Sequence, residues 1–352
     1  MHKSTTVLLQ VAQASAVIEE RPLPVLGDNE SLVKVEAVAL NPYDWKMLYG
    51  RTPPVPTVLG CDFAGVVEAV GAHVCSVKPG DRVAGMTMGG NTLRPQDGAF
   101  ATYLVAPTHA LLHLPDDMSF ENGATLPTPV FTAGFCLYHQ LSLPYPDRDA
   151  VFNGNAPTLL VYGGATSIGL MLIQMAKLTG MRVLTVCSRQ SAHLAEAFGA
   201  DAVFDYSDHN CENDLRNETG GNIQYTVDCI SDHQSAAICA AAMGCKSGFY
   251  ISLTANGPTI NARDVQTIKI VGFTILGREF SFGFKGVASP VVEEDVAFAT
   301  QFAVLIEQFF SDDKIKPLRA EVRVEGLSGI VSGLNDLREG KVHGKRLVYQ
   351  TA

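Results

Sequence analysis

The chain has 352 residues, which is enough for two domains, and a formal net charge of −10. This charge argues against non-specific binding to nucleic acid, because such binding requires a basic face. The sequence contains no run of about 18 apolar residues, and its polar start, MHKSTT, is not typical of a signal peptide. We therefore expect a cytoplasmic globular protein that binds neither nucleic acid nor a membrane.

Eight cysteines are scattered along the chain, and no two of them form a C-x-x-C pair. This spacing argues against a zinc ribbon and against a thioredoxin-type redox pair. Several cysteines lie inside apolar runs, such as TVCS and VDCI, where we expect them to pack as small buried side chains.

Residues 1–126 have the pattern of a β-rich domain interrupted by glycines. The stretch LVKVEAVAL alternates partly between apolar and polar residues, and Asn41-Pro42 ends it. A helix is expected to begin near Ser119. Further strands and turns are expected in three stretches, LGCDFAGVVEAVG, VKPGDRVAG and GAFATYLVAP.

From about Pro127 the pattern changes to alternating helices and strands. A helical segment, VFTAGFCLYHQL, precedes the polar loop PYPDRDAVFNGNAP, which is typical of a surface insertion. Strand patterns separated by helices then follow in TLLVY, VLTV, AVFDY, QYTVDCIS, GFYISL and TIKIVGFTIL. This alternation predicts a doubly wound α/β sheet. The chain closes with an amphipathic helix, EEDVAFATQFAVLIEQFF, the stretch PLRAEVRV, a helix near LSGIVSGLNDLREG and a last strand, KRLVYQ.

The turn after the strand TLLVY reads GATSIG, and it matches the dinucleotide fingerprint G-x-G-x-x-G except that Thr166 replaces the middle glycine. Gly164 permits the tight turn, and Gly169 lets the following helix pack close to the strand. That helix N-terminus offers N–H groups to a pyrophosphate, and Thr166 adds a hydroxyl beside it. A structural turn without a ligand is the alternative. The candidate pyrophosphate-binding residues are Gly164, Ala165, Thr166, Ser167 and Ile168.

The end of the next strand favours NADPH over NADH. NAD sites hold the ribose 2′-hydroxyl with an acid about 20 residues past the glycines, whereas this strand ends in Cys187-Ser188-Arg189. Ser188 can donate to a 2′-phosphate, Arg189 can neutralise it or stack on the adenine, and Tyr206 can add its hydroxyl or ring face. Taken singly, Arg189 is also compatible with a solvated surface arginine, and Tyr206 with a strand-end aromatic.

These motifs, in this order, resemble the medium-chain dehydrogenases/reductases over essentially the whole chain. NPYDWK, LGCDFAGVVEAVG and VKPGDRVAG are similar to the catalytic domain of that superfamily, and YGGATSIG, AEAFGADAVFDY and GKRLVYQ to its cofactor domain and C-terminal return. The NPxDxK motif, the GGxT turn and the Pro-rich insertion resemble the lovastatin-type, trans-acting enoyl reductases of fungal polyketide synthases. The resemblance implies a Rossmann cofactor domain over residues 127–285 and a GroES-like catalytic domain over residues 1–126 and 286–352.

The resemblance also implies the site residues. Lys46 is the predicted catalytic residue, because a cation of the catalytic domain can fix the nicotinamide ribose; an ordinary surface lysine is the alternative. Beyond the glycine turn, the predicted cofactor contacts, of which Trp45 and Arg189 lie outside the family pattern, are Tyr43, Asp44, Trp45, Lys46, Ser188, Arg189, Gln190, Ser191, Tyr206, Leu253, Thr254, Val342 and His343. The predicted lining of the substrate channel, with helix-core packing as the alternative, is Val130, Phe131, Thr132, Ala133, Gly134, Phe135, Cys136 and Leu137.

No metal is expected. Zinc-dependent members of the superfamily use a Cys and a Gly-His-Glu as catalytic ligands, and here Asn41 resembles the Cys position while Cys61-Asp62 fill the His-Glu positions. A catalytic zinc needs about three converging ligands, and Cys61 with Asp62 provides two at best. The four-cysteine structural lobe of those relatives has no counterpart in the sequence.

We therefore predict an NADPH-dependent enoyl reductase that acts in trans on an α,β-unsaturated thioester tethered to a polyketide synthase carrier domain. The alternatives are a free-standing quinone or enone reductase and a catalytically silent NADPH-binding scaffold. The resemblance favours a monomer, and Phe280 and Phe282 are a candidate wall for the polyketide chain. The candidate basic residues for docking an acidic carrier domain are Arg278, Lys285, Lys314, Lys316 and Arg319.

Overall fold

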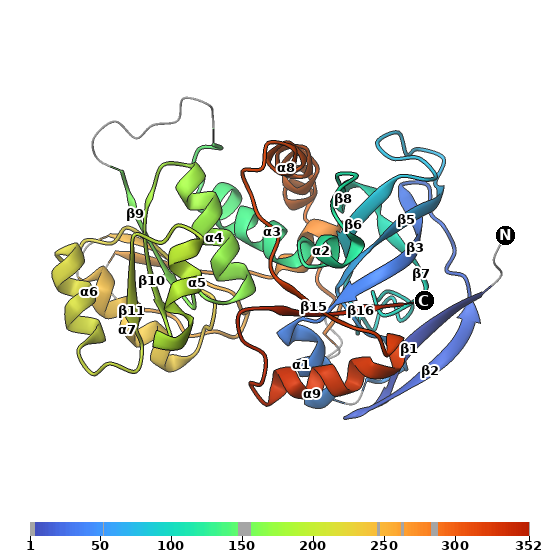
Figure 1. The fold of residues 1–352 in the computed structure, drawn as a ribbon, viewed down its shortest axis with the longest axis horizontal. Coiled ribbons are helices and arrows are strands. Elements are labelled where there is room, and N and C mark those ends of the chain that lie inside the picture. The colour runs from blue at the N-terminus through green and yellow to red at the C-terminus, as the bar shows by residue number, and fades with distance from the viewer. Residues whose placement is uncertain are drawn as a thin grey trace. The chain divides into compact units, whose positions relative to one another are not determined.

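The structure, a computed structural model, describes residues 4–51, 53–146, 156–244, 247–261, 264–282 and 288–351. It divides the chain into two compact units (Figure 1): unit 1 contains residues 1–128 and 273–352, and unit 2 contains residues 129–272. Most of the predicted polar insertion, residues 147–155, lies outside the described residues, and so does Lys285.

Unit 1 is built on antiparallel strands, as its partly alternating sequence predicts. The smaller sheet has the order β2-β1-β4, and the larger sheet has the order β15-β16-β3-β5-β6-β8, with β7 also paired to β3. Strands β15 and β16 pair in parallel, which attaches the C-terminal return to the larger sheet. The strands are β1 (Ser4–Ala12), β2 (Ser15–Pro22), β3 (Glu30–Ala39), β4 (Thr57–Val58), β5 (Asp62–Val70), β6 (Arg82–Met86), β7 (Tyr103–Pro107), β8 (Leu111–His113), β15 (Ala320–Arg323) and β16 (Arg346–Gln350).

The helices of unit 1 pack against its sheets and against one another. Helix α9 packs on α1, and α8 packs beside β8. They are α1 (Pro42–Gly50), α2 (Phe120–Ala124), α8 (Glu293–Ser311) and α9 (Ile330–Arg338), with short 3₁₀ turns η1 (Thr108–Ala110) and η5 (Gly326–Gly329).

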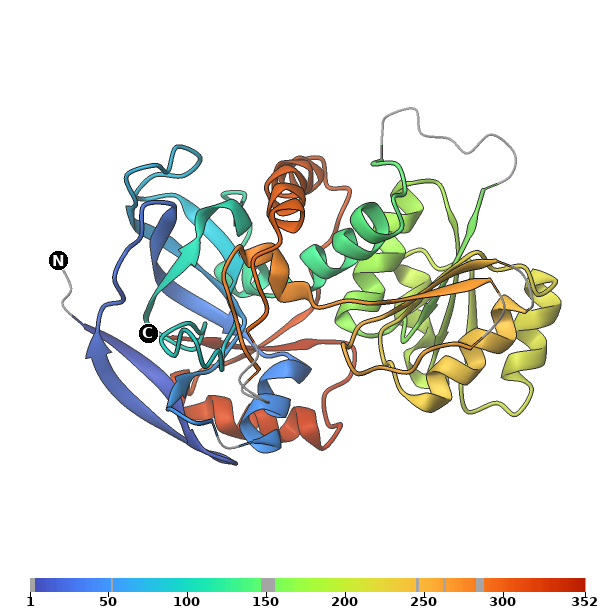
Figure 2. The same cartoon turned by 180° about the vertical axis from the view of Figure 1, so that it is seen from behind.

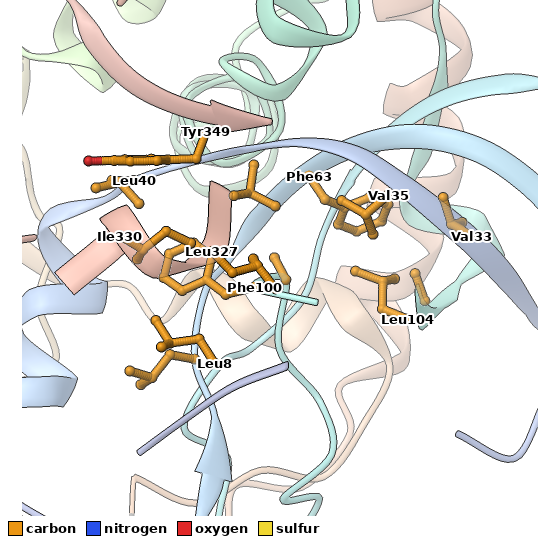
Figure 3. Packing of buried hydrophobic residues seen from close by; sticks show 14 of the residues in the cluster. Leu8, Val33, Val35, Leu40, Phe63, Phe100, Leu104, Leu327, Ile330 and Tyr349 are labelled. Atoms are coloured by element: carbon orange, nitrogen blue, oxygen red, sulfur yellow. The ribbon is translucent and has the colours of Figure 1, made fainter. Parts of the chain in front are cut away.

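The main core of unit 1 joins residues from both ends of the chain. Leu8, Phe63 and Phe100 come from the N-terminal part, and Ile330 and Tyr349 come from the C-terminal part (Figure 3). Each of these side chains is at most 2% exposed, and burial of a Leu or Phe side chain contributes about 1.5–3 kcal/mol. The C-terminal return is therefore a structural part of this unit.

Unit 2 contains a six-stranded sheet with the order β11-β10-β9-β12-β13-β14, in which every named pair is parallel. This confirms the predicted doubly wound sheet, whose strand order reverses its direction beside the first strand. Figure 1 shows α4 and α5 over one face of the sheet, and Figure 2 shows α7 over the other. The strands are β9 (Thr158–Tyr162), β10 (Arg182–Cys187), β11 (Ala202–Asp205), β12 (Tyr225–Asp228), β13 (Gly248–Ser252) and β14 (Val265–Lys269).

Helical elements connect the consecutive parallel strands from β9 to β13, as crossover connections do. Helix α3 begins at the end of unit 1 and continues directly into a π-helical segment, η2. The helical elements are α3 (Pro127–Gly134), η2 (Phe135–Gln140), α4 (Ser167–Leu178), η3 (Arg189–Ser191), α5 (Ala192–Ala197), α6 (Cys211–Thr219), α7 (His233–Met243) and η4 (Gly272–Leu276).

The segment TIKIVGFTIL differs from its predicted single strand. The strand β14 ends at Lys269, and Gly272–Leu276 form the 3₁₀ turn η4. Residues 273–282 then belong to unit 1, whereas the sequence analysis assigned residues up to 285 to the cofactor domain. The reason is packing: Phe273 lies against Tyr43 of α1 with ring centroids 4.8 Å apart.

Candidate functional site

The glycine turn of unit 2 requires glycine at two positions for steric reasons. It follows β9 at Tyr162 and begins with Gly163, which has φ +81°. A Cβ on Gly164 would lie 1.7 Å from Oγ1 of Thr185, and a Cβ on Gly169 would lie 2.3 Å from the carbonyl oxygen of Gly163. Neither position has room for a side chain, so β9, β10 and the start of α4 approach as closely as a dinucleotide-binding turn demands.

Thr166 stands where the fingerprint has its middle glycine, and it is the N-cap of α4. Its Oγ1 accepts the N–H of Gly169 at 3.1 Å and donates to the carbonyl of Gly163 at 2.7 Å. The hydroxyl predicted to lie beside a pyrophosphate therefore directs its proton into the turn. Because Gly169 is capped, the N–H groups of Ser167 and Ile168 are those that the first turn of α4 offers to an anion.

The loop after β10 carries the predicted phosphate contacts. Ser188 precedes the 3₁₀ turn η3, and its hydroxyl donates to Oγ of Ser191 at 3.2 Å. Arg189 is exposed at the start of that turn. The loop thus presents a hydroxyl pair and a guanidinium at the carboxyl edge of the sheet, where ligands of open α/β sheets bind.

An acid that the sequence analysis overlooked lies beside this loop. Asp205 ends β11 and is the register partner of Cys187 at the end of β10. The carboxylate accepts the backbone N–H and the hydroxyl of Ser207 at 2.9 and 2.8 Å. These bonds lower the pKa of Asp205, and the Arg189 backbone and guanidinium lower it further. The parallel pairing of β10 and β11 could have indicated this position, because it brings the carboxyl ends of neighbouring strands together.

The loop after β13 is tied to the loop after β12. The N–H of Leu253 donates to Oγ of Ser231 at 2.9 Å, and the hydroxyl of Ser252 donates to the carbonyl of Thr254 at 3.3 Å. Leu253 and Thr254, both predicted cofactor contacts, are therefore held by side chains that the sequence analysis did not assign.

The predicted substrate-channel segment is mostly core. Residues 130–137 run from α3 into the π-helical segment, and of these eight residues only Thr132 is not buried. A π-helical segment often marks a functional position, and Thr132, on α3 just before it, is the partly exposed member of the predicted set. The buried apolar members are compatible with both the predicted channel and the helix-core alternative, because an apolar helix face and an apolar channel wall have the same sequence pattern.

Helix α1 of unit 1 carries Lys46. The backbone N–H of Asn41 donates to Oδ2 of Asp44 at 2.8 Å, which fixes the start of the helix. Burial raises the pKa of the Asp44 carboxyl to about 7. Lys46 is exposed, with its Nζ 5.8 Å from the ring centroid of Trp45. Lys46 therefore presents a cation at the surface of unit 1, whereas Asp44 is a buried structural acid.

Aromatic side chains surround Tyr43 within unit 1. Its hydroxyl donates to the carbonyl of Gly89 at 3.2 Å. The ring of Phe282 lies 6.5 Å from that of Tyr43 and 5.5 Å from that of Phe280, which is 2% exposed. Of the two residues predicted to form a wall for the polyketide chain, Phe280 is thus a core residue and Phe282 is half-buried.

The positions that resemble zinc ligands, Asn41, Cys61 and Asp62, form no metal site with any other residue that the structure describes. The charge of Asp62 is neutralised by Arg346. Oδ2 of Asp62 lies 2.8 Å from Nη2 of Arg346 and 3.0 Å from the amide nitrogen of Asn41, and Oδ1 accepts the N–H and hydroxyl of Thr128 at 2.9 and 2.6 Å. Burial raises the pKa of the Cys61 thiol well above its ordinary range. Among the described residues no group of three His, Cys, Asp or Glu side chains is placed to hold a metal. These donors do not fit a catalytic zinc.

The remaining predicted residues are more scattered. Val342 packs against the core of unit 1, and His343 is exposed. Arg278, a candidate for docking, has a side chain that is only 9% exposed, with Nη1 3.0 Å from Oδ2 of Asp97 and a second ion pair to Glu30. The exposed basic candidates that the structure describes are Lys314, Lys316 and Arg319. In the described part of the chain, no helix is both long and apolar enough to cross a membrane.

Comparison with known families matches both halves of the chain. The alcohol dehydrogenase GroES-like domain matches residues 27–116, and the zinc-binding dehydrogenase domain matches residues 167–281. Among solved structures, the CurK enoyl reductase superimposes with a TM-score of 0.78 at 17% identity, covering 98% of this chain and 99% of that one. A mycobacterial protein in complex with NADPH superimposes with a TM-score of 0.74 at 23% identity, covering 99% and 100%. At these identities the likeness shows the shared fold, which confirms the predicted GroES-like and Rossmann architecture.

Relatives at higher identity identify the family. A trans-enoyl reductase of Alternaria alternata is 41% identical over 346 residues, which cover 97% of this chain and 98% of the relative. A trans-enoyl reductase of Aspergillus sclerotiorum is 37% identical over 350 residues, with 96% and 97% covered. The chain therefore belongs to the trans-enoyl reductases, a family of oxidoreductases within the medium-chain dehydrogenase/reductase superfamily.

Proposed function

We propose that this enoyl reductase uses NADPH to reduce an α,β-unsaturated polyketide thioester held by the carrier domain of a separate synthase. One observation supports the proposal most strongly. The 41% identity to a trans-enoyl reductase extends over 97% of the chain, so the similarity includes both unit 1 and unit 2. Under this proposal the protein is a monomer that acts without zinc in the cytoplasm.

The residues of unit 2 fit a dinucleotide with a 2′-phosphate. Gly164 and Gly169 allow the close approach of β9, β10 and α4 in the turn, because a Cβ at either position would collide with Thr185 or with the Gly163 carbonyl, and the first turn of α4 supplies N–H donors for a pyrophosphate. Ser188 and Arg189 supply a hydroxyl and a cation for the phosphate. Ser207 donates two hydrogen bonds to Oδ1 of Asp205, and the nearby Arg189 lowers the pKa of this carboxyl, so a cation accompanies the acid at this strand end. The remaining assigned contacts, from Tyr43 to His343, follow from the family resemblance.

When bound, NADPH supplies the hydride that adds to the β-carbon of the conjugated thioester, and a proton adds to the α-carbon. Lys46, an exposed cation on α1, fixes the nicotinamide ribose. Thr132 contacts the substrate chain, and the buried residues around it hold α3, which carries it. We assign no side chain as the proton donor; water supplies the proton.

Steady-state NADPH consumption tests the proposal. The substrates are one enoyl group presented as a carrier-domain thioester, the same group as a short free thioester, and a diffusible quinone. We expect the largest kcat/KM with the carrier-bound thioester and a strong preference for NADPH over NADH. A larger kcat/KM with the quinone would establish the free-standing reductase instead, and NADPH binding without turnover of any of the three would indicate a silent scaffold.

A further inference from the structure

A buried carboxylate lies at the carboxyl edge of the sheet in unit 2. Asp228, the last residue of β12, is 0% exposed. Its Oδ1 accepts the N–H groups of Ile230 and Ser231 at 3.0 and 2.8 Å, and its Oδ2 accepts the hydroxyls of Ser235 and Tyr250 at 2.5 and 2.7 Å. Such a group is stable in the interior because each lone-pair direction has a donor. It fixes the loop after β12 to both α7 and β13.

Ser231 extends this arrangement to the next loop. It adopts φ +61°, a left-handed conformation that is costly for a side chain other than glycine. Its hydroxyl donates to the carbonyl of Asp228 at 2.8 Å and accepts the N–H of Leu253 at 2.9 Å. The strained backbone therefore aims one hydroxyl so that it links the loop after β12 to the loop after β13.

The same loop also meets the glycine turn. The N–H of Cys229 donates to the carbonyl of Tyr162 at 2.9 Å, and a Cβ on Gly163 would lie 3.2 Å from Cβ of Cys229. Strands β9, β12 and β13 are neighbours in the sheet. Hydrogen bonds of Asp228, Cys229 and Ser231 thus join three adjacent strand ends, two of which carry proposed cofactor contacts.

We propose that Ser231 is a positioning residue of the cofactor site, with Asp228 as its anchor. The hydroxyl of Ser231 keeps Leu253 and Thr254 at a fixed place relative to the glycine turn, so that the dinucleotide meets a preformed loop. A preformed loop does not lose conformational entropy on binding, so affinity depends on it. This inference rests on the proposed binding of NADPH.

Substitution Ser231→Gly separates positioning from stability. Glycine adopts φ +61° without strain, which offsets the loss of the two hydrogen bonds and leaves the melting temperature nearly unchanged. The N–H of Leu253 loses its short acceptor and keeps only a 3.4 Å contact with the carbonyl of Asp228. The loss of one such bond corresponds to a roughly 2–10-fold weaker NADPH affinity. We expect KM for NADPH to rise by the same factor and kcat at saturating NADPH to stay the same.

Asp264→Gly is the matched control. Asp264 is also left-handed, with φ +68°, but it lies just before β14, at the amino end of the parallel strands. Fluorescence titration with NADPH at about 15 °C, where all three proteins are folded, gives the dissociation constants. Weaker binding by Ser231→Gly alone supports the inference. Equal affinity of Ser231→Gly and Asp264→Gly overturns it, and so does a lowered melting temperature with unchanged affinity. Failure of the unsubstituted protein to bind NADPH would instead refute the proposed function.

Discussion

Replacement of Arg346 by methionine should strongly destabilise unit 1. The guanidinium is 3% exposed and lies 2.8 Å from Oδ2 of Asp62, which is 0% exposed. It also donates to the carbonyls of Thr125 and Leu40 at 2.7 and 3.1 Å and to the amide oxygen of Asn41 at 2.7 Å. This one side chain joins β16 to the end of β3, the start of β5 and the segment before α3.

The magnitude follows from what the substitution leaves behind. Methionine retains most of the apolar stem, so the loss of packing is small. The carboxylate of Asp62 keeps the neutral donors of Asn41 and Thr128 but loses its cation, and removal of one partner from a buried ion pair costs about 3–5 kcal/mol. For a unit of this size the melting temperature should fall by roughly 10 °C, since 1 kcal/mol corresponds to about 2–4 °C.

The assay can follow unit 1 by itself, because the chain has one tryptophan, Trp45, and it lies on α1. Urea unfolding monitored by its fluorescence should be measured for Arg346→Met, Asp62→Asn and the double variant. We expect each single change to destabilise and the double variant to recover at least about 2 kcal/mol relative to additivity, because two buried charges are then removed together.

The control for this cycle is Arg21→Met. Nε of Arg21 lies 3.1 Å from Oε1 of Glu19 on β2, and the two side chains are 36% and 45% exposed. Surface pairs of this kind contribute about 0–1 kcal/mol. Losses below about 1 kcal/mol for Arg346→Met, or strictly additive effects in the cycle, would refute the view that Asp62 depends on this cation.

Three further predictions concern single residues. Lys46→Ser should abolish turnover while the far-ultraviolet circular dichroism stays unchanged; retained kcat/KM would remove Lys46 from the site. Ser188→Asp should weaken NADPH binding about 10–100-fold by charge repulsion and erase or reverse the preference over NADH, as measured by paired titrations. Because the folded pKa of Asp44 is raised from 3.8 to about 7, the folded state binds the extra proton, so stability should fall as pH rises from about 4 to 7. Asp44→Asn should flatten that dependence in urea midpoints, and an unchanged slope would contradict the assignment.

The parallel sheet and the glycine turn could be predicted because their signals are local. The turn needs Gly164 and Gly169 within a few residues of each other, and the steric contacts with Thr185 and with the Gly163 carbonyl show the reason. The use of Thr166 as an N-cap is also a local signal, since threonine is a preferred capping residue. Its hydroxyl could have been assigned to the turn from the sequence.

Other features depend on contacts between distant residues. Asp62 and Arg346 are 284 positions apart, and no periodicity in either segment indicates that they meet. Arg278 reads as a surface cation until the structure brings Asp97 and Glu30 beside it. Asp205 comes next to the loop after β10 only through the register of β10 and β11. Such placements follow from the packed fold, because charge and polarity along the sequence do not determine which side chains are buried together.

Asp62 and Asp228 show two ways of keeping a carboxylate inside this protein. Each is 0% exposed and lies at one end of a strand, and each holds a segment that carries proposed cofactor residues: α1 in unit 1 and the loop after β13 in unit 2. Asp62 has a cationic partner, so its removal leaves an unpaired guanidinium. The N–H groups and hydroxyls that donate to Asp228 are neutral, so Asp228→Asn strands none of them as an unpaired cation and chiefly disturbs geometry. Substitution of Asp62 should therefore lower mainly the free energy of unfolding, whereas substitution of Asp228 should lower mainly the NADPH affinity.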